Sequence, residues 1–318
     1  MSDQKTIKFD KFGYGIFLLK SKNSLFNADF SHEPRQLPDE AGTFYATDKS
    51  LKYCIRRWVY DNYDGIEKIF FWRRDKEGGK PMNISENYEH LFDNNSRLAA
   101  ENLLSCWDVR VFGAVFPVKK KEEDKGESNE KASFSITGPI QITYGINKVK
   151  SEQQTYSNQI LSPFVNSKKK NDMARTIGNE NKALEMHLMF DYAINPKTLR
   201  DFAEKGLELT NKDVDLFKEA LCRGVSYVNS SAKIGSESEF MLYLESSKHS
   251  TLPLLKDYID VTINDSGNTV IDLNEITELI KGYDEIEKIE AYYEPIHTQI
   301  ENAPQKMKKF NIFTGVEI

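Results

Sequence analysis

The chain is poor in the residues that build disulfide frameworks and metal centres. Its 318 residues include only three cysteines, which lie far apart and form no CxxC pair: Cys54, Cys106 and Cys222. Its five histidines are isolated and lack the spacing of metal ligands. These absences exclude a disulfide scaffold and a cysteine zinc site. They favour buried thiols in a reducing compartment, and we expect neither a metal nor another cofactor.

Long apolar runs are absent as well. No stretch reaches the 18 or so apolar residues of a membrane-spanning helix, and residues 1–11 are polar, without the apolar centre of a signal peptide. We therefore expect a cytoplasmic protein with no membrane partner.

Catalytic signatures are also missing. The chain has no GxSxG, no Walker loop and no GxGxxG after a strand. Residues 262–273 have the glycine of a calcium loop, but Thr262 and Leu273 at the anchoring positions make it an ordinary turn. His187, inside a predicted strand, is interpreted as structural. The sequence thus predicts no catalytic residue.

Net charge argues against a uniformly basic surface. The chain carries 43 basic and 49 acidic residues, for a net charge of -6. The charge is unevenly distributed, because residues 260–301 are strongly acidic whereas residues 161–182 are basic. A local nucleic-acid interface therefore remains compatible with the composition.

The most informative stretch is residues 47–60. Leu51, Ile55, Trp58 and Val59 recur with the spacing of one buried helical stripe. Thr47 or Asp48 can cap the start of this helix. A second face carries the basic ridge of Lys49, Lys52 and Arg56. Such a ridge on a packed helix can follow a phosphate backbone, although a solvated charged face is the alternative.

The order of predicted elements indicates an α+β fold. We predict strands over 12–20, 66–74, 108–118, 133–146 (with a kink at Gly138-Pro139), 183–194, 240–244 and 287–293, and helices over 47–60, 96–106, 213–225 and 275–281. Residues 260–273 form a hairpin candidate. The core order is the split βαβ of ferredoxin-like and RNA-recognition-like domains. Residues 119–131 are a charged linker, and residues 147–181 are predicted to form a projecting arm.

Several weak features together favour single-stranded nucleic acid. The loop over 21–46 is long for a compact domain and carries Asn27 and Arg35. Thr137, Gly138 and Gln141 are small or polar enough to let a nucleic-acid backbone approach the sheet. With the ridge and the basic arm they describe a groove that tracks one strand. Asp29 is the acid best placed to act on bound RNA, and an ordinary loop acid is the alternative.

Four ordered motifs resemble a known family. They are the segment from Asn27 through Pro34-Arg35 to Ile55-Arg56, then Asp108-Val109-Arg110-Val111-Phe112-Gly113, then Ser135-Ile136-Thr137-Gly138-Pro139-Ile140-Gln141, and finally Ala174 to Gly178 with Ala193-Ile194-Asn195-Pro196. Over residues 12–245 this resembles the Cas-seven superfamily, the backbone subunits of type I CRISPR Cascade complexes, most closely its type I-B (Csh-two) branch. Residues after 246 match no motif of that family.

The resemblance implies an RNA-recognition-like palm (1–60, 107–146 and 183–318), a fingers insertion (61–106) and a projecting thumb hairpin (147–182). It implies a non-catalytic subunit that polymerises along CRISPR RNA (crRNA) in antiviral defence and presents guide bases to target DNA. Its partners would be crRNA, target DNA, further copies of itself and other Cascade subunits, namely the backbone-capping, large and small subunits.

The resemblance also assigns residues. The expected RNA-binding set is Asn27, Arg35, Thr47, Lys49, Lys52, Arg56, Arg110, Thr137, Gly138, Gln141, Lys168, Lys169, Arg175, Thr176 and Ile177. Ile177 or Val115 would be the apolar wedge of the guide. The sequence departs from the family in the loop over 23–29, which lacks the usual glycine and proline. Type III relatives cleave RNA with a loop aspartate, so an alternative function is a metal-dependent endoribonuclease acting through Asp29.

Overall fold

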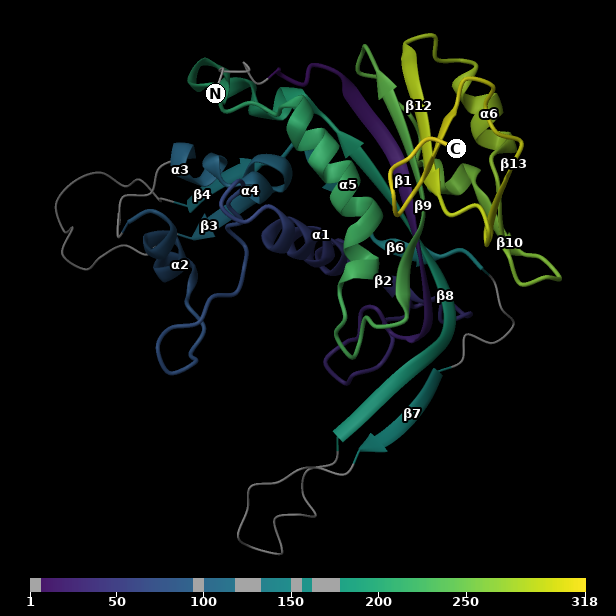
Figure 1. Ribbon diagram of the computed structural model, residues 1–318, viewed down its shortest axis with the longest axis horizontal. Helices are drawn as coiled ribbons and strands as arrows, with labels where there is room; N and C mark the ends of the chain where they lie inside the picture. Colours follow the sequence, from purple (N-terminus) through teal and green to yellow (C-terminus); the bar gives the residue numbers. More distant parts are fainter. Residues whose placement is uncertain (1–6, 94–99, 118–132, 150–155, 162–177) are drawn as a thin grey trace, which may run out of the picture.

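The computed structural model describes residues 7–93, 100–117, 133–149, 156–161 and 178–318, which form an α+β fold (Figure 1). Its largest sheet has nine strands in the order β14-β12-β9-β1-β8-β6-β2, with β5 and β7 also paired to β8. These strands are β1 (Phe12–Ser24), β2 (Tyr45–Ala46), β5 (Ile140–Ile142), β6 (Gly145–Asn147), β7 (Tyr156–Leu161), β8 (Gly178–Ile194), β9 (Ser236–Ser246), β12 (Ile286–Tyr293) and β14 (Lys308–Asn311).

Strand β1 lies at the centre of this sheet. It pairs antiparallel with β8 on one side and with β9 on the other, so β8 and β9 run parallel to each other. The strand predicted at 12–20 is confirmed and continues to Ser24, because pairing with β8 persists to Ala183. The strand predicted at 133–146 is interrupted at Gly138-Pro139, where a kink was predicted: β4 (Ser133–Thr137) ends just before these residues, and β5 begins just after them in a different sheet.

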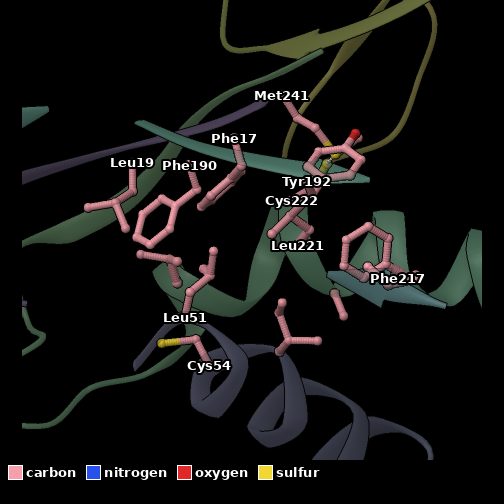
Figure 2. Packing of buried hydrophobic residues seen from close by; sticks show 14 of the residues in the cluster. Phe17, Leu19, Leu51, Cys54, Phe190, Tyr192, Phe217, Leu221, Cys222 and Met241 are labelled. Atoms are coloured by element: carbon pink, nitrogen blue, oxygen red, sulfur yellow. Dashed lines mark hydrogen bonds between the residues drawn. The ribbon is translucent and has the colours of Figure 1, made fainter. Parts of the chain in front are cut away.

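Two helices cover one face of the sheet. Helix α1 (Asp48–Asn62) and helix α5 (Asn211–Tyr227) pack against each other and against the strands. Figure 2 shows Leu51 and Cys54 of α1 facing Leu221 of α5, with Phe17 and Phe190 of the sheet above them. The helices predicted at 47–60 and 213–225 are therefore confirmed, and the buried stripe anchors α1 to the sheet.

The C-terminal residues cover the opposite face (Figure 1). Ile16, Leu18 and Leu242 of the sheet pack there with Ile271 and Ile276. This layer contains the short helices η3 (Leu255–Tyr258) and α6 (Asn274–Ile280) and a three-stranded sheet of β10 (Asp260–Ile263), β11 (Thr269–Asp272) and β13 (Thr298–Glu301). The predicted hairpin, helix and strand in this region are confirmed. The acidic segment is thus an integral layer of the fold.

A smaller layer beside α1 differs from the prediction. Its elements are α2 (Ile84–Leu91), α3 (Ala100–Ser105), α4 (Trp107–Phe112) and a two-stranded sheet of β3 (Gly113–Pro117) and β4; a 3-10 helix, η2 (Pro196–Lys205), follows β8. The strand predicted at 108–118 is wrong for residues 108–112, which are helical, and only β3 is extended.

The strand predicted at 66–74 is also wrong. The amides of Phe70 and Phe71 donate to the Asp108 carboxylate, at 2.7 and 3.0 Å, so a side chain replaces the neighbouring strand as acceptor. The helix predicted at 96–106 is confirmed in part by α3. Helix α2 was not predicted, although Asn83 and Glu86 form a capping box that marks its start.

A hairpin of β7 and β8 projects from the body of the molecule, where an arm was predicted (Figure 1). Residues 150–155 and 162–177 lie outside the described residues, as do the linker residues 119–131. The predicted RNA-binding residues of the arm all fall there: Lys168, Lys169, Arg175, Thr176 and Ile177. No helix within the described ranges is long and apolar enough to cross a lipid bilayer.

His187 lies buried in β8 between two carboxylates. Its Nδ1 is 2.7 Å from Glu239 and its Nε2 is 3.2 Å from Glu185, while Lys20 lies 3.7 Å from Glu239. Glu239 also accepts a 2.5 Å hydrogen bond from Thr269 of β11. Burial opposes charge on the imidazole, but the hydrogen bonds to the two carboxylates outweigh it and raise the pKa of His187. The structural interpretation of His187 is confirmed, because it joins the main sheet to the C-terminal layer.

This arrangement predicts a pH-dependent contribution to stability. A raised folded-state pKa means that protonated His187 stabilises the fold fully below the unfolded pKa of about 6.5, and that this contribution is lost as pH rises through the folded pKa. We expect the difference in unfolding free energy between wild type and His187→Gln to be larger at pH 6 than at pH 9, as measured by urea denaturation. A difference that is constant or grows with pH would contradict the pairing.

Candidate nucleic-acid interface

The start of α1 is fixed by two side chains that the sequence placed in the site. Thr47 caps the helix, its hydroxyl accepting from the Ser50 amide. Asn27 Oδ1 in turn accepts from the Thr47 amide at 2.9 Å and from the Thr47 hydroxyl at 3.0 Å. The long loop is therefore held against the start of the helix, and Asn27 is brought to Thr47, two residues before Lys49.

The basic ridge is only partly exposed. Lys49 is exposed, and no carboxylate in the described part of the chain pairs with it. The Lys52 side chain is only 12% exposed; its ammonium lies 3.0 Å from Asp48 and over the Phe112 ring. Arg56 is 15% exposed, and its Nε donates to Asp108 at 2.9 Å. The expectation of a solvent-facing ridge is correct for Lys49 and wrong for Lys52 and Arg56, because those cations have partners inside the protein.

Asp108 is the centre of this buried cluster. Its carboxylate is fully buried and accepts from Arg56 and from the amides of Phe70 and Phe71. The Arg56 guanidinium also lies over the rings of Phe71 and Phe112. Sequence reasoning missed this role, although an acid between the apolar residues Trp107 and Val109 was the available signal.

Three of the sequence motifs meet at Phe112. Lys52 and Arg56 lie 5.2 and 5.5 Å from the centroid of its ring. Gly138 packs on its backbone so closely that an added Cβ would lie 2.1 Å from the Phe112 carbonyl carbon. Residues 47–56, 108–113 and 135–141 therefore form one contiguous structure. Thr137 and Gln141 are exposed beside it, and the Gln141 amide donates to the Gly138 carbonyl at 2.8 Å.

Arg110 lies apart from the exposed residues. Its guanidinium donates to Asp213 at the start of α5, to Glu67 and to the Leu104 carbonyl. Burial opposes the charge, but these carboxylates outweigh burial and raise the pKa of Arg110. The side chain is 14% exposed and joins α4 to α5, so its hydrogen-bonding capacity is used within the protein.

Arg35, in the loop before α1, has the opposite environment. Its Nε is buried without a hydrogen-bond partner, and no carboxylate in the described region pairs with its guanidinium. A buried donor that lacks an acceptor is costly, and a ligand oxygen can relieve that cost. Arg35 and Lys49 are thus the predicted cations that the described part of the fold leaves free for a ligand.

Asp29 and Val115, two further residues singled out in the sequence, lie in different surroundings. Asp29 Oδ1 accepts from the amides of Ser31 and Glu33, so this oxygen organises its own loop. In the described ranges, no three His, Cys, Asp or Glu residues are grouped as metal ligands. Val115, one candidate wedge, is 66% exposed on β3, and the other, Ile177, lies outside the described residues.

The described residues define an α+β fold in which α1 and α5 cover one face of a nine-stranded sheet. The family model described as CRISPR-associated protein Cas7 matches residues 11–286. The chain belongs to that family.

Solved structures resemble the chain only distantly. One is titled "CRISPR RNA-guided surveillance complex" and shares 12% identity at a TM-score of 0.44, covering 92% of this chain and 95% of the other. A second, titled "CRISPR RNA-guided surveillance complex, pre-nicking", has the same identity and TM-score and covers 94% and 96%. No curated protein matches.

Proposed function

We propose that this chain is a crRNA-binding backbone subunit of a type I, I-B-like CRISPR Cascade effector in the cytoplasm. One observation carries the proposal: in a member of the Cas7 family, Arg35 and Lys49 lack acidic partners in the described region, beside a helix cap held by Asn27. Phosphate oxygens are the natural partners of such cations. Its other partners would be further copies of itself, the target DNA and the other Cascade subunits.

The sheet order supports a palm in this proposal. Strands β9-β1-β8-β6, with α1 and α5 on one face, have the order of a split βαβ domain. We assign the palm to residues 1–60, 107–146 and 183–318, the fingers to 61–106 and the thumb to 147–182. The hairpin of β7 and β8 would form the base of that thumb.

The basic residues divide into two roles in this proposal. Arg35 and Lys49 contact phosphates directly, with the first turn of α1 adding its positive dipole end. Lys52, Arg56 and Arg110 act through the protein. Lys52 pairs with Asp48 of the same helix and lies over the Phe112 ring, whereas the ion pairs of Arg56 and Arg110 hold α1 and α4 in place. Affinity should then be sensitive to salt and insensitive to guide sequence. We propose no catalysis, since Asp29 already serves its own loop.

The test compares two charge-matched double variants. We expect Arg35→Ala with Lys49→Ala to bind single-stranded RNA at least about tenfold more weakly than wild type at about 0.1 M salt. The plot of log affinity against log salt should also become less steep, by roughly 1.4, because two phosphate contacts are lost. Fluorescence anisotropy across a salt series measures both quantities.

The control is Lys306→Ala with Lys308→Ala, which removes two exposed charges at the start of β14, the edge strand of the main sheet. This control should retain wild-type affinity and slope. Equal losses in the two double variants would show that only net charge matters, and the proposed interface would be wrong.

A further inference from the structure

Two tyrosines stack at the edge of the main sheet, next to the proposed interface. The rings of Tyr45 and Tyr144 have centroids 5.6 Å apart and planes 19° from parallel. Tyr45 lies in β2, opposite Ile146 of β6, and Tyr144 directly precedes β6. Diagonal neighbours across paired strands can bring large rings into contact, so the strand register explains the stack.

The core does not require these rings. Phe44 and Ala46, on either side of Tyr45, are buried in the core, and alternation along the strand turns Tyr45 to the other face. Tyr144 is 51% exposed. Within the described region neither hydroxyl has a hydrogen-bond partner, and neither ring contacts a third ring. The pair is therefore fixed in orientation and open to a ligand.

The position of the pair connects it to the free cations. The Tyr45 amide donates to the Arg35 carbonyl at 3.0 Å, and Gln36 pairs antiparallel with Phe44. Arg35 is thus directly opposite Tyr45, and the side chains of directly opposed residues lie on the same face of the paired strands. Thr47 and Lys49 follow two and four residues after Tyr45. The Arg35 side chain and the Tyr45 ring therefore lie on the same side of this strand pair, and Lys49 lies in the first turn of α1, four residues after Tyr45.

We propose that Tyr45 and Tyr144 form a stacking platform for one unpaired base of the bound single-stranded RNA, next to a phosphate held by Arg35. This inference rests on the proposed function and adds a base subsite to it. Aromatic rings stack on the π-face that every base has, so the platform is tolerant of sequence. Stacking also leaves the hydrogen-bonding edge of the base free, as a guide requires for pairing with its target.

The test separates the ring from its hydroxyl and the base from its backbone. Tyr144→Leu removes the aromatic face, whereas Tyr144→Phe keeps it. Two oligonucleotides of equal length are compared by anisotropy: a single-stranded RNA, and an oligomer whose riboses carry no bases. We expect Tyr144→Leu to bind the RNA about tenfold more weakly and the base-free oligomer as wild type does, while Tyr144→Phe resembles wild type on both. Photocrosslinking of wild type to RNA should label Tyr144.

Tyr227→Leu is the matched control, because Tyr227 on α5 is 38% exposed and should not affect RNA affinity. Equal affinity of wild type and Tyr144→Leu for the RNA overturns the platform while leaving the proposed function intact. If folded wild type binds neither oligonucleotide, the proposed function itself fails. If Tyr144→Leu binds RNA normally but no longer assembles in multiple copies on it, the rings contact a second copy and the base subsite is overturned.

Discussion

Replacing Asp108 by alanine is expected to lower the free energy of unfolding by about 3–5 kcal/mol. The Asp108 carboxylate is fully buried and accepts from the Arg56 guanidinium and two main-chain amides. Alanine leaves the Arg56 charge, only 15% exposed, without its counterion, and it leaves the Phe70 and Phe71 amides without an acceptor. Urea denaturation followed by circular dichroism measures this loss.

Two further variants make the result specific. Asp75→Ala removes an aspartate whose partner, Arg73, is 70% exposed, so its cost should stay within about 1 kcal/mol. Adding Arg56→Met to Asp108→Ala removes the unpaired charge and should recover part of the lost stability. Two results would contradict the role of Asp108 as the counterion that holds α1. One is a loss of unfolding free energy in Asp75→Ala as large as that in Asp108→Ala. The other is a loss in the double variant larger than the summed losses of Asp108→Ala and Arg56→Met.

Helical periodicity predicted α1, which is buried on one side, and a continuous apolar run predicted β1, which is buried on both faces. The stripe of Leu51, Ile55 and Val59 fixed the type and orientation of α1, and the apolar run after Phe12 fixed β1. Short apolar runs are ambiguous, because a buried strand and a buried helical turn share their composition. Residues 108–112 were therefore predicted as a strand, whereas tertiary contacts of Asp108 favour a helical turn there.

The sequence identified basic residues but not which of them are free. Arg56 forms its ion pair with Asp108, which is 52 residues away in the sequence, and Arg110 forms its ion pair with Asp213, which is 103 residues away. No local pattern reports such pairs, because they form only when the layers pack. Contacts between residues far apart in the sequence also explain why the C-terminal layer was not assigned a role. Its sequence matches no motif of the family, but its apolar residues cover Ile16, Leu18 and Leu242 on the second face of the sheet.

Gly138→Ala is expected to cost about 3 kcal/mol of stability, near the upper end of overpacking effects. An added Cβ would lie 2.1 Å from the Phe112 carbonyl carbon and 2.2 Å from the Gly113 amide nitrogen, and both are main-chain atoms that cannot rotate away. The layer of α4 and β3 would have to move from the sheet, and the Phe112 ring beneath Lys52 and Arg56 would move with it.

Gly282→Ala is the matched control for this change, because its nearest contact, the Leu279 carbonyl oxygen, would be 3.6 Å from the new Cβ. Thermal or urea unfolding should show a loss for Gly138→Ala that is several times larger than for Gly282→Ala. Comparable stability losses in the two variants would mean that the layer of α4 and β3 can shift to accommodate the added methyl group at little cost. The close contact at Phe112 would then be no constraint on the basic residues of α1, and the three motifs would not act as one structure.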